Sequence, residues 1–363
     1  MTVMRTDAFT ASHIVQKITD ALLLLAILLP LALLLTLFLT FSTLSSARAD
    51  DGASCRGTDL LQELKQNDPP AYQAIVDKGD AVPNGKGLLW KIEKPGLEPS
   101  WLLGTMHVTD PRVLVMPAGA KSAFDKSATV VIESDEILDE KKAAASILMK
   151  PELSMFTNGK TISDFLDNNE TAELKAGLAE RGIPLEAVSR MQPWMIASFV
   201  AMPACELARK AQGASFLDKK IAEDAIADGK QVKGLETLVE QLTAMSELPT
   251  SFHLQALIET LALGDKMQDV MYTMTELYLS GDIGMTMPML EATAPTGEKD
   301  DSAYADFEKR IITDRNHVMA DRSTPILEEG NVFIAVGALH LPGDEGLVEL
   351  LRDKGFKVTA VTQ

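Results

Sequence analysis

Short apolar runs near both ends of the chain predict the strands of a sheet. The runs cover residues 88–92, 100–107, 129–133, 231–236, 331–340 and 357–361. Each run is shorter than an ordinary helix, and several are rich in β-branched residues, which is typical of buried strands. Residues 331–340 give the strongest strand signal of the six.

Apolar residues recur at helical spacing through the middle of the chain and predict two long helical stretches. The first covers about residues 137–230 without a candidate strand, and the second covers about 237–322. Within the first stretch we expect helix caps at Thr171 and Ser215 and helix-ending glycines at Gly182 and Gly229. Shorter helices are expected over residues 59–66, 71–78, 118–126 and 345–354, and a loop over 294–301.

The first fifty residues have the pattern of an export segment. Residues 21–41 are apolar and uncharged, and Ala47-Arg48-Ala49 matches the small-residue rule for signal-peptide cleavage. The apolar run also has roughly the 20 residues that span a bilayer, so an uncleaved membrane anchor is the alternative. Both interpretations give a leader over 1–49 and one domain over 50–363. In both, that domain is exported to a periplasmic or extracellular location, or held outside the cytoplasm by an inner-membrane anchor.

Composition and charge indicate which partners and which disulfide bonds the chain can have. The chain has 363 residues, 46% of them hydrophobic, and a net charge of −18. This composition excludes a long disordered protein, and the negative charge makes nucleic acid an unsuitable partner. The two cysteines, Cys55 and Cys205, are too few for a disulfide scaffold. Because an oxidising compartment favours paired thiols, we predict a bridge between them.

Two segments share one plan, in which an apolar strand leads into Gly-x-x-His, a loop and a helix. They are WLLGTMHVTDPRV, residues 101–113, and FIAVGALHLPGDEG, residues 333–346, and a β-branched strand follows the helix in each. This repeat predicts an α/β (α+β) fold. Its small, mostly buried sheet is built from two strand-GxxH-helix-strand units, and a large helical insertion lies in the middle. His107 and His340 would lie at equivalent strand ends.

Two carboxylates end the strands that accompany these histidines. Glu133 and Glu236 each follow a predicted strand, and ligands collect outside the carboxyl ends of strands in open α/β sheets. Imidazoles and carboxylates that converge there would suit a divalent metal ion. Arg315 would bind a substrate carboxylate or stabilise an oxyanion. The structural alternative is that the histidines fix their turns by hydrogen bonds and that Arg315 forms a surface ion pair.

Familiar hydrolase and nucleotide motifs are missing from the sequence. It contains no His-Glu-x-x-His, no Gly-x-Ser-x-Gly and no P-loop pattern. An ordinary zincin, a simple α/β-hydrolase and a P-loop nucleotide-binding protein are therefore excluded.

The combination of motifs resembles the TraB/GumN family, whose wider clan includes the Tiki membrane-linked proteases. The resemblance covers nearly all of the chain after the leader. It is carried by residues 101–107 (WLLGTMH), 131–133 (VIE), 217–218 (LD), 234–237 (GLET) with 240–241 (EQ), 314–316 (DRN) and 335–343 (AVGALHLPG). Cys205-Glu206 and Cys55 are similar to the GumN-type branch.

The resemblance implies a metal-dependent hydrolase that resembles a peptidase and acts on a peptide or protein substrate. It implies His107, Glu133 and His340 as ligands of a divalent ion such as Mn²⁺, Co²⁺ or Zn²⁺. Glu133, Glu236 and Arg315 are the expected catalytic groups, with one glutamate taking a proton from water and Arg315 steadying an oxyanion. The alternative is a non-catalytic envelope binding or accessory protein that holds a metal, peptide or saccharide in the same crevice.

Overall fold

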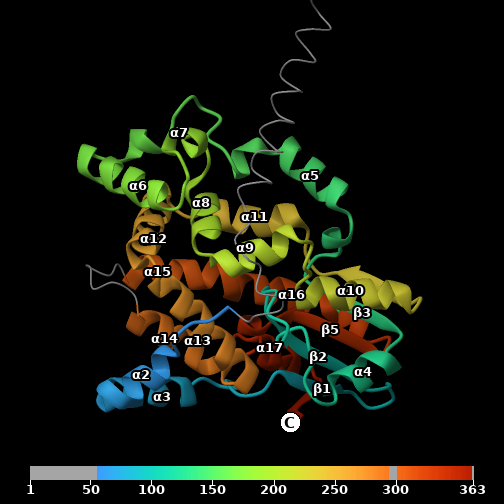
Figure 1. The fold of residues 1–363 in the computed structure, drawn as a ribbon. Coiled ribbons are helices and arrows are strands. Elements are labelled where there is room, and N and C mark those ends of the chain that lie inside the picture. Colours follow the sequence, from blue (N-terminus) through green and yellow to red (C-terminus); the bar gives the residue numbers. More distant parts are fainter. Residues whose placement is uncertain (1–54, 294–300, 362–363) are drawn as a thin grey trace, which may run out of the picture. The chain divides into compact units, whose positions relative to one another are not determined.

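Six strands form one mixed sheet in the computed structural model, which describes residues 55–293 and 301–361 (Figure 1). The strands are β1 (Leu89–Glu93), β2 (Ser100–Thr105), β3 (Thr129–Ile132), β4 (Gln231–Gly234), β5 (Val332–Gly337) and β6 (Lys357–Ala360). Their order is β4-β3-β5-β2-β1-β6, and β4, β3, β5 and β2 are parallel neighbours. β1 runs antiparallel to both of its neighbours, β2 and β6. The predicted mixed fold with a small sheet is confirmed.

Sixteen α-helices are present in the described parts of the chain. Those before the end of β4 are α2 (Leu60–Asn67), α3 (Pro69–Asp80), α4 (Ala120–Lys126), α5 (Glu140–Met149), α6 (Asn168–Glu180), α7 (Leu185–Val188), α8 (Pro193–Val200), α9 (Ala204–Ala211) and α10 (Leu217–Ala227). Those after it are α11 (Leu238–Ser246), α12 (Thr250–Leu263), α13 (Lys266–Ser280), α14 (Thr286–Thr293), α15 (Asp301–Glu308), α16 (Asp314–Leu327) and α17 (Leu347–Asp353). The chain between β3 and β4 and the described chain between β4 and β5 consist of helices and connecting segments, where the sequence predicts its two helical stretches.

The two Gly-x-x-His units interleave instead of pairing internally. β2 and β3 belong to the first unit, but both pair with β5 of the second unit. The last strand of the second unit, β6, lies at the far edge of the sheet beside β1. Both histidine-bearing strands are therefore direct parallel neighbours, and their carboxyl ends lie at the same edge.

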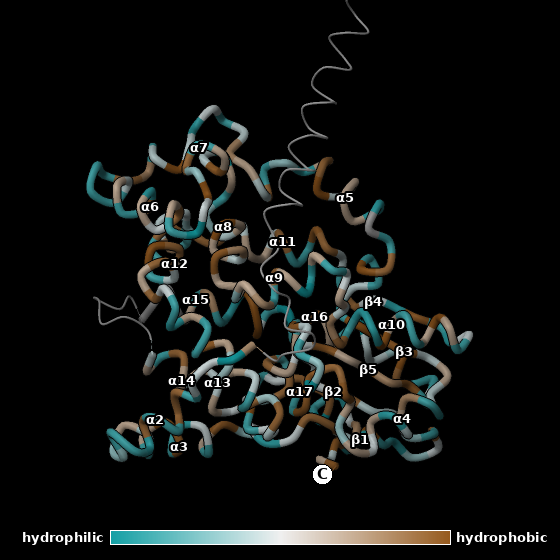
Figure 2. Tube along the Cα trace, in the orientation of Figure 1, coloured by the Kyte–Doolittle hydropathy of each residue, from teal (hydrophilic) through white to brown (hydrophobic). Residues whose placement is uncertain are grey.

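Both faces of the central strands are buried, which explains their nearly continuous apolar sequences. Along β5, Phe333 and Ala335 pack against α4 and α10 on one face. Val332, Ile334 and Val336 alternate with them and pack against α16 and α17 on the other face. Figure 2 shows these strands as the hydrophobic centre of the sheet, between helices whose outer residues are hydrophilic.

Two further apolar clusters hold helices that lie away from the sheet. α12 contacts both α6 and α8, and the three helices share a cluster that includes Leu174, Ile196 and Leu257 (Figure 1). α2, α3, α13 and α14 meet around Ile75 and Met289. The helical parts of the chain therefore have cores of their own besides the two faces of the sheet.

Helix ends differ from the sequence expectation at two caps and agree at two glycines. The cap predicted at Thr171 is wrong, because Asp167 caps α6 and accepts hydrogen bonds from the Asn169 and Glu170 N–H groups. The cap predicted at Ser215 is also wrong, because α10 begins at Leu217 without a side-chain cap. A carboxylate one turn earlier satisfies the free N–H groups of α6 better than a threonine inside the helix does.

The glycines predicted to end these helices are confirmed. Gly182 and Gly229 follow α6 and α10 with φ of 69° and 72°. This left-handed backbone conformation ends a helix at no steric cost only when the residue lacks a Cβ atom.

The helical stretch predicted over 237–322 contains a distortion next to Arg315. α15 and α16 are joined by a π-helical turn, Lys309–Thr313. The Arg315 Nη1 donates to the Ile311 carbonyl inside this turn, 3.2 Å away. Such turns occur frequently at functional sites.

The leader expected over 1–49 and most of the loop expected over 294–301 lie outside the described residues. Among the residues that the structure describes, none of the helices is both long and apolar enough to cross a membrane.

Close packing between the two motif units requires the first motif glycine. A Cβ atom at Gly104 would lie 3.0 Å from both the Cα and the Cβ of Ala338. We expect Gly104→Ala to lower the free energy of unfolding by about 1–3 kcal/mol, measured by urea denaturation. Adding Ala338→Gly should restore only part of the loss, because the clash with the Cα remains. An unchanged midpoint in Gly104→Ala would contradict this packing.

Candidate metal centre

Three side chains that follow parallel strands converge at one edge of the sheet. His107 follows β2, Glu133 follows β3, and His340 ends a 3₁₀ turn, Ala338–His340, directly after β5. The register places Thr105 opposite Gly337 and Ile132 opposite Ala335, so β2 and β5 end at the same level and β3 ends two residues earlier at the same edge. The expectation that the two motif histidines meet beside a carboxylate is confirmed.

Glu133 is the centre of this arrangement. Its Oε1 lies 3.9 Å from the Nε2 of His107 and 3.9 Å from the Nε2 of His340. The same oxygen accepts a hydrogen bond of 2.7 Å from the Gly337 N–H. Its Oε2 accepts hydrogen bonds from Arg315 Nη2 at 2.8 Å and from Gln241 Nε2 at 3.1 Å. The carboxylate is buried, and three donors determine its orientation.

The orientation of His340 follows from a second pair of hydrogen bonds. Asn316 Nδ2 donates to the Glu345 carbonyl at 2.9 Å, which leaves its Oδ1 as an acceptor. His340 Nδ1 lies 2.7 Å from this Oδ1 and therefore carries the proton. The lone pair of His340 Nε2 then faces Glu133 Oε1. This hydrogen bond has the form of the outer contact that orients metal-binding histidines.

His107 is held in a corresponding way by a carboxylate from the helical insertion. Asp218, the second residue of α10, is buried, and its Oδ2 lies 3.1 Å from His107 Nδ1. Its Oδ1 accepts a hydrogen bond of 2.6 Å from the Thr105 hydroxyl. The His107 ring also packs edge-on against Phe216. His107 remains 54% exposed, so it forms the solvent side of the site.

The three groups at the centre have strongly shifted pKa values. Burial would raise the pKa of Glu133, but the neighbouring imidazoles and Arg315 lower it to about 2. Burial lowers the pKa of His340 to about 4 in spite of the nearby glutamate. For His107, burial favours the neutral ring, but Asp218 and Glu133 outweigh it and raise the pKa to about 9. These environments keep the glutamate ionised and His340 neutral at neutral pH.

The second motif glycine makes room for this centre. A Cβ atom at Gly337 would lie 3.1 Å from Glu133 Oε1, 3.5 Å from His340 Cδ2 and 3.8 Å from His107 Nε2. Its φ of −52° is one that any residue adopts. The glycine is therefore required by the space between the three side chains and not by its backbone conformation.

Arg315 links the centre to Glu236, the other expected catalytic carboxylate. Its Nε donates to both Glu236 oxygens at 3.1 Å, and its Nη2 donates to Glu236 Oε2 at 2.7 Å and to Glu133 Oε2. Arg315 thus connects two buried carboxylates. Glu236 reaches the histidines only through this arginine, whereas Glu133 faces them directly.

A cavity of about 330 Å³ opens over the centre. Its polar end is lined by His107, Glu133, Arg315 and His340, and its remaining walls are mainly apolar. Glu236 does not line this cavity but a neighbouring one of about 400 Å³ on the other side of Arg315. The structure therefore brings four of the five expected site residues to one cavity and places the fifth behind it.

The chemistry of the centre fits a divalent cation. His107, Glu133 and Asp218 offer ligand atoms within 4.8 Å of one another. Asp218 Oδ2 is buried with His107 Nδ1 3.1 Å away, and the His340 Nε2 lone pair faces a carboxylate oxygen. Two ligands about 2.1 Å from one ion lie at most about 4.2 Å apart, so both separations of 3.9 Å are compatible with a shared ion.

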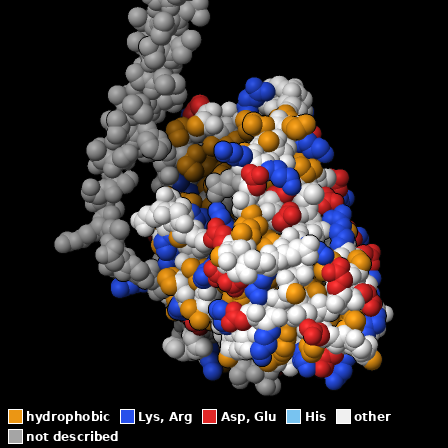
Figure 3. Space-filling model, turned by 90° about the vertical axis from the view of Figure 1, so that its right-hand side faces the viewer, with side chains coloured by type: hydrophobic (Ala, Val, Ile, Leu, Met, Phe, Trp, Pro, Cys, Tyr) orange, Lys and Arg blue, Asp and Glu red, His pale blue; other side chains and the backbone are white. Residues whose placement is uncertain are grey.

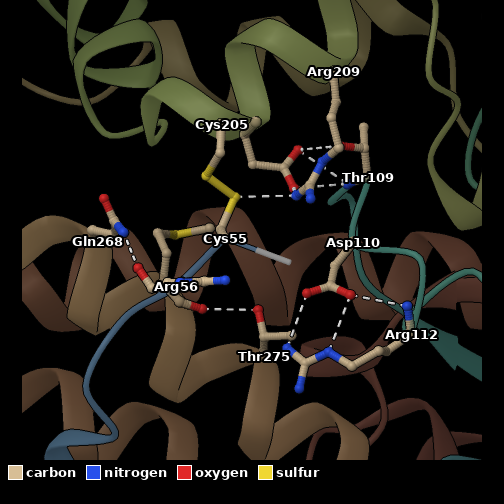
Figure 4. Close-up of a disulfide and its surroundings, with 11 residues drawn as sticks. Cys55, Arg56, Thr109, Asp110, Arg112, Cys205, Arg209, Gln268 and Thr275 are labelled. Atoms are coloured by element: carbon tan, nitrogen blue, oxygen red, sulfur yellow. Dashed lines mark hydrogen bonds and ion pairs between the residues drawn. A yellow bond between two sulfur atoms is a disulfide. The ribbon is translucent and has the colours of Figure 1, made fainter. Parts of the chain in front are cut away.

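The predicted bridge between Cys55 and Cys205 is confirmed, and Figure 4 shows its surroundings. Glu206, next to Cys205 on α9, is buried and accepts hydrogen bonds from the Thr109 N–H at 3.0 Å and from its hydroxyl at 2.8 Å. Arg209 donates to Glu206, to the Thr109 hydroxyl and to the Cys55 sulfur. The disulfide therefore belongs to the network that holds the loop two residues after the first motif histidine.

The sequence analysis predicts no site role for three residues that the structure places around the centre, namely Asp218, Glu206 and Gln241. Asp218 and Glu206 lie in helices of the insertion, and Gln241 lies in α11, far from either motif along the chain. Their only sequence signal was their presence in the stretches that carry the family resemblance. The positions of the strands in the sequence do not reveal which helix packs beside a strand end and places its polar side chain there.

The face that carries α4, α5 and α10 shows acidic and basic side chains interspersed over its lower part (Figure 3). Hydrophobic side chains gather around a hollow in the upper part of the same view. Charges of both signs therefore lie side by side on this face.

Comparison with known proteins gives a consistent set of relatives. The family model described as the TraB/PrgY/gumN family matches residues 88–360. Metalloprotease TIKI1 of Danio rerio is 26% identical over 315 residues, which cover 74% of this chain and 62% of the relative. Metalloprotease TIKI2 of Danio rerio is 24% identical and is covered over 64% of its length. A metalloprotease TIKI homolog of Nematostella vectensis is 26% identical over 78% of this chain and 69% of its own length. No solved structure matches.

The shifted pKa values predict opposite charge states for the two motif histidines in metal-free protein. Between pH 6 and pH 8 we expect His107 to be protonated and His340 to be neutral with its proton on Nδ1. Nitrogen-15 NMR of the imidazoles measures both states. Asp218→Asn should lower the pKa of His107, because it removes the carboxylate that favours the charged ring. A His340 ring that titrates near pH 6.5 would contradict the described environment.

The disulfide should contribute to stability as well as to the site. It closes a loop of 150 residues, so replacing both cysteines by serine should lower the free energy of unfolding by about 2–5 kcal/mol in urea denaturation. Wild-type protein under reducing conditions should unfold like the double variant. Glu206→Gln should keep the disulfide and still lose stability, because it removes the charged acceptor of the hydrogen bonds from Thr109 and Arg209. Two free thiols in native protein, detected by mass spectrometry, would disprove the bridge.

Proposed function

Because the chain belongs to the TraB/PrgY/gumN family and its two Gly-x-x-His motifs meet at one cavity, we propose that it is a metal-dependent hydrolase that cleaves peptide bonds. One observation carries the proposal. The Nε2 atoms of His107 and His340 both face Glu133 Oε1, each at 3.9 Å, at the polar end of the cavity. This arrangement supplies two imidazoles and one carboxylate at one end of the cavity.

His107, Glu133 and His340 would hold the ion, as the sequence indicated. Asp218 and Asn316 would orient the two imidazoles through their Nδ1 atoms. When bound, a divalent ion such as Mn²⁺, Co²⁺ or Zn²⁺ supplies Lewis-acid polarisation of a carbonyl and lowers the pKa of a water molecule. Buried Glu133 supplies the negative charge that favours a cation at this position.

The geometry favours Glu133 over Glu236 as the carboxylate that acts on a molecule in the cavity. Glu133 lines the cavity, whereas both Glu236 oxygens accept hydrogen bonds from Arg315 outside it. Arg315 uses its Nε and Nη2 to hold the two carboxylates. We therefore propose that Arg315 positions Glu133 and that Glu236 positions Arg315.

Relatives support a peptide or protein as the substrate, since the similar proteins named above are called metalloproteases. The chain spans 62% and 64% of the length of the first two of them, so activity and substrate are proposed here for this chain on its own residues. The Cys55–Cys205 disulfide supports an exported domain, because such bonds persist in oxidising compartments.

A peptide-cleavage assay tests the proposal. Purified protein loaded with Mn²⁺, Co²⁺ or Zn²⁺ should cleave members of a peptide library, with products identified by mass spectrometry. A chelator, His107→Ala and His340→Ala should each reduce cleavage to background. Asn316→Ala should reduce it by about 10–100-fold, because His340 loses the group that orients it.

His317→Ala provides the matched control. His317 lies on the same helix as Arg315, is half exposed and does not line the cavity. This variant should keep full activity and metal content. Stoichiometric metal uptake without cleavage of any peptide would favour the alternative of a non-catalytic binding protein. Cleavage that survives the chelator and both histidine variants would refute the metal-dependent mechanism.

A further inference from the structure

The cavity has two chemically distinct ends. The four residues with charged or titratable side chains described above line its polar end. Around the remainder lie Met106, Val108, Met271, Met274, Ile283 and Leu339. We propose that this apolar wall is a specificity subsite that accepts an uncharged aliphatic side chain of the substrate, next to the bond that is cleaved. This inference rests on the proposed function, because it names the substrate class of the same site.

Two residues of the apolar wall are sequence neighbours of the motif histidines. Met106 directly precedes His107, and Leu339 directly precedes His340. Both residues line the cavity, so each Gly-x-x-His motif contributes one candidate ligand and one apolar wall residue. A substrate whose carbonyl lay at the polar end would therefore place a neighbouring side chain against the wall.

Helix α13 supplies the opposite part of the wall and is tied to the loop after the first motif histidine. Met271 and Met274 lie three residues apart, which places them on the same face of the helix. Arg112, in the loop that follows His107, forms an ion pair of 2.5 Å with Glu276 of α13. This ion pair helps to hold the methionines at a set distance from the polar end.

The charge distribution determines which side chains the wall can accept. Within the cavity lining, the side chains of opposite permanent charge are Glu133 and Arg315, and they form an ion pair with each other. A lysine, aspartate or glutamate side chain placed against the wall would lose water without gaining an oppositely charged partner. A leucine, methionine or isoleucine side chain would gain contacts with thioether and aliphatic groups.

The methionines should make the subsite distinguish aliphatic from charged side chains, but not one aliphatic side chain from another of similar size. Their unbranched side chains change rotamer easily and adapt to several aliphatic groups. We therefore expect discrimination of about 10–200-fold between alanine and a larger aliphatic residue, and stronger rejection of charged residues. Preferences among leucine, methionine and isoleucine should be small.

The test uses metal-loaded protein and a randomised library of octapeptides with blocked ends. Mass spectrometry should show aliphatic residues enriched at one fixed position relative to the cleaved bond. Met271→Phe, which fills the cavity, should shift the preference toward alanine, and Met271→Ala should shift it toward larger side chains. Met274→Glu should admit lysine at that position. These shifts in preference distinguish a subsite from a purely structural role of the methionines.

Met267→Phe is the matched control, because Met267 lies on the same helix but does not line the cavity. Its cleavage profile should equal that of the wild type. Metal content and thermal unfolding are measured for each variant, and the wild-type profile alone tests the inference if a variant does not fold. Cleavage without positional preference, or a preference that folded wall variants leave unchanged, would overturn the subsite.

Failure of the proposed function gives a different result. If the wild type cleaves no peptide, fluorescence anisotropy measures binding of the same blocked peptides carrying a dye. Tighter binding of peptides with a central leucine than of those with a central lysine or glutamate would support the subsite, provided that Met271→Phe abolishes the difference. Equal binding of all three peptides would overturn it.

Discussion

The Glu133 carboxylate is the group on which the rest of the site depends. It is buried at the end of β3, where it would be costly to ionise without partners. Gly337, Gln241 and Arg315 donate to its two oxygens, and these donors come from β5, α11 and α16. One charged group thus joins the central sheet to two helices. Its Oε1 also faces both motif histidines, so the partners that stabilise the charge also define the candidate metal centre.

Parallel pairing of the two motif strands is the second constraint. Because β2 and β5 are direct neighbours in register, His107, two residues after Thr105, and His340, three residues after Gly337, arrive at the same edge of the sheet. The motif glycines then serve two different contacts. Gly104 allows the backbone of the other unit to approach, and Gly337 leaves space between the glutamate and both imidazoles. The repeated Gly-x-x-His pattern therefore reflects one packing requirement and one requirement of the site.

Site residues that come just after a predicted strand could be placed from the sequence. Buried strands end shortly before His107, Glu133 and His340. The hydrophobic pattern predicts where these strands end, and this is sufficient to place the three residues at one edge of the sheet. Glu236 follows a strand as well, but the side chain of Arg315 lies between it and the cavity, which strand position does not encode. Asp218 could not be assigned, because its role depends on how α10 packs on the sheet. The helix caps failed for a local reason, since Asp167 offered a better acceptor than Thr171.

The helical insertion contributes side chains that hold the first motif histidine and the loop after it. α10 brings Asp218 to His107, and α9 brings Glu206 to the loop that follows this histidine. The disulfide lies next to Glu206, so a covalent bond between distant segments holds one end of that network. A sheet with two histidines at its edge would leave the rings free to rotate. Because these helices hold Asp218 and Thr109 in place, the first imidazole is presented to Glu133 before any ligand arrives, which reduces the entropy lost on binding.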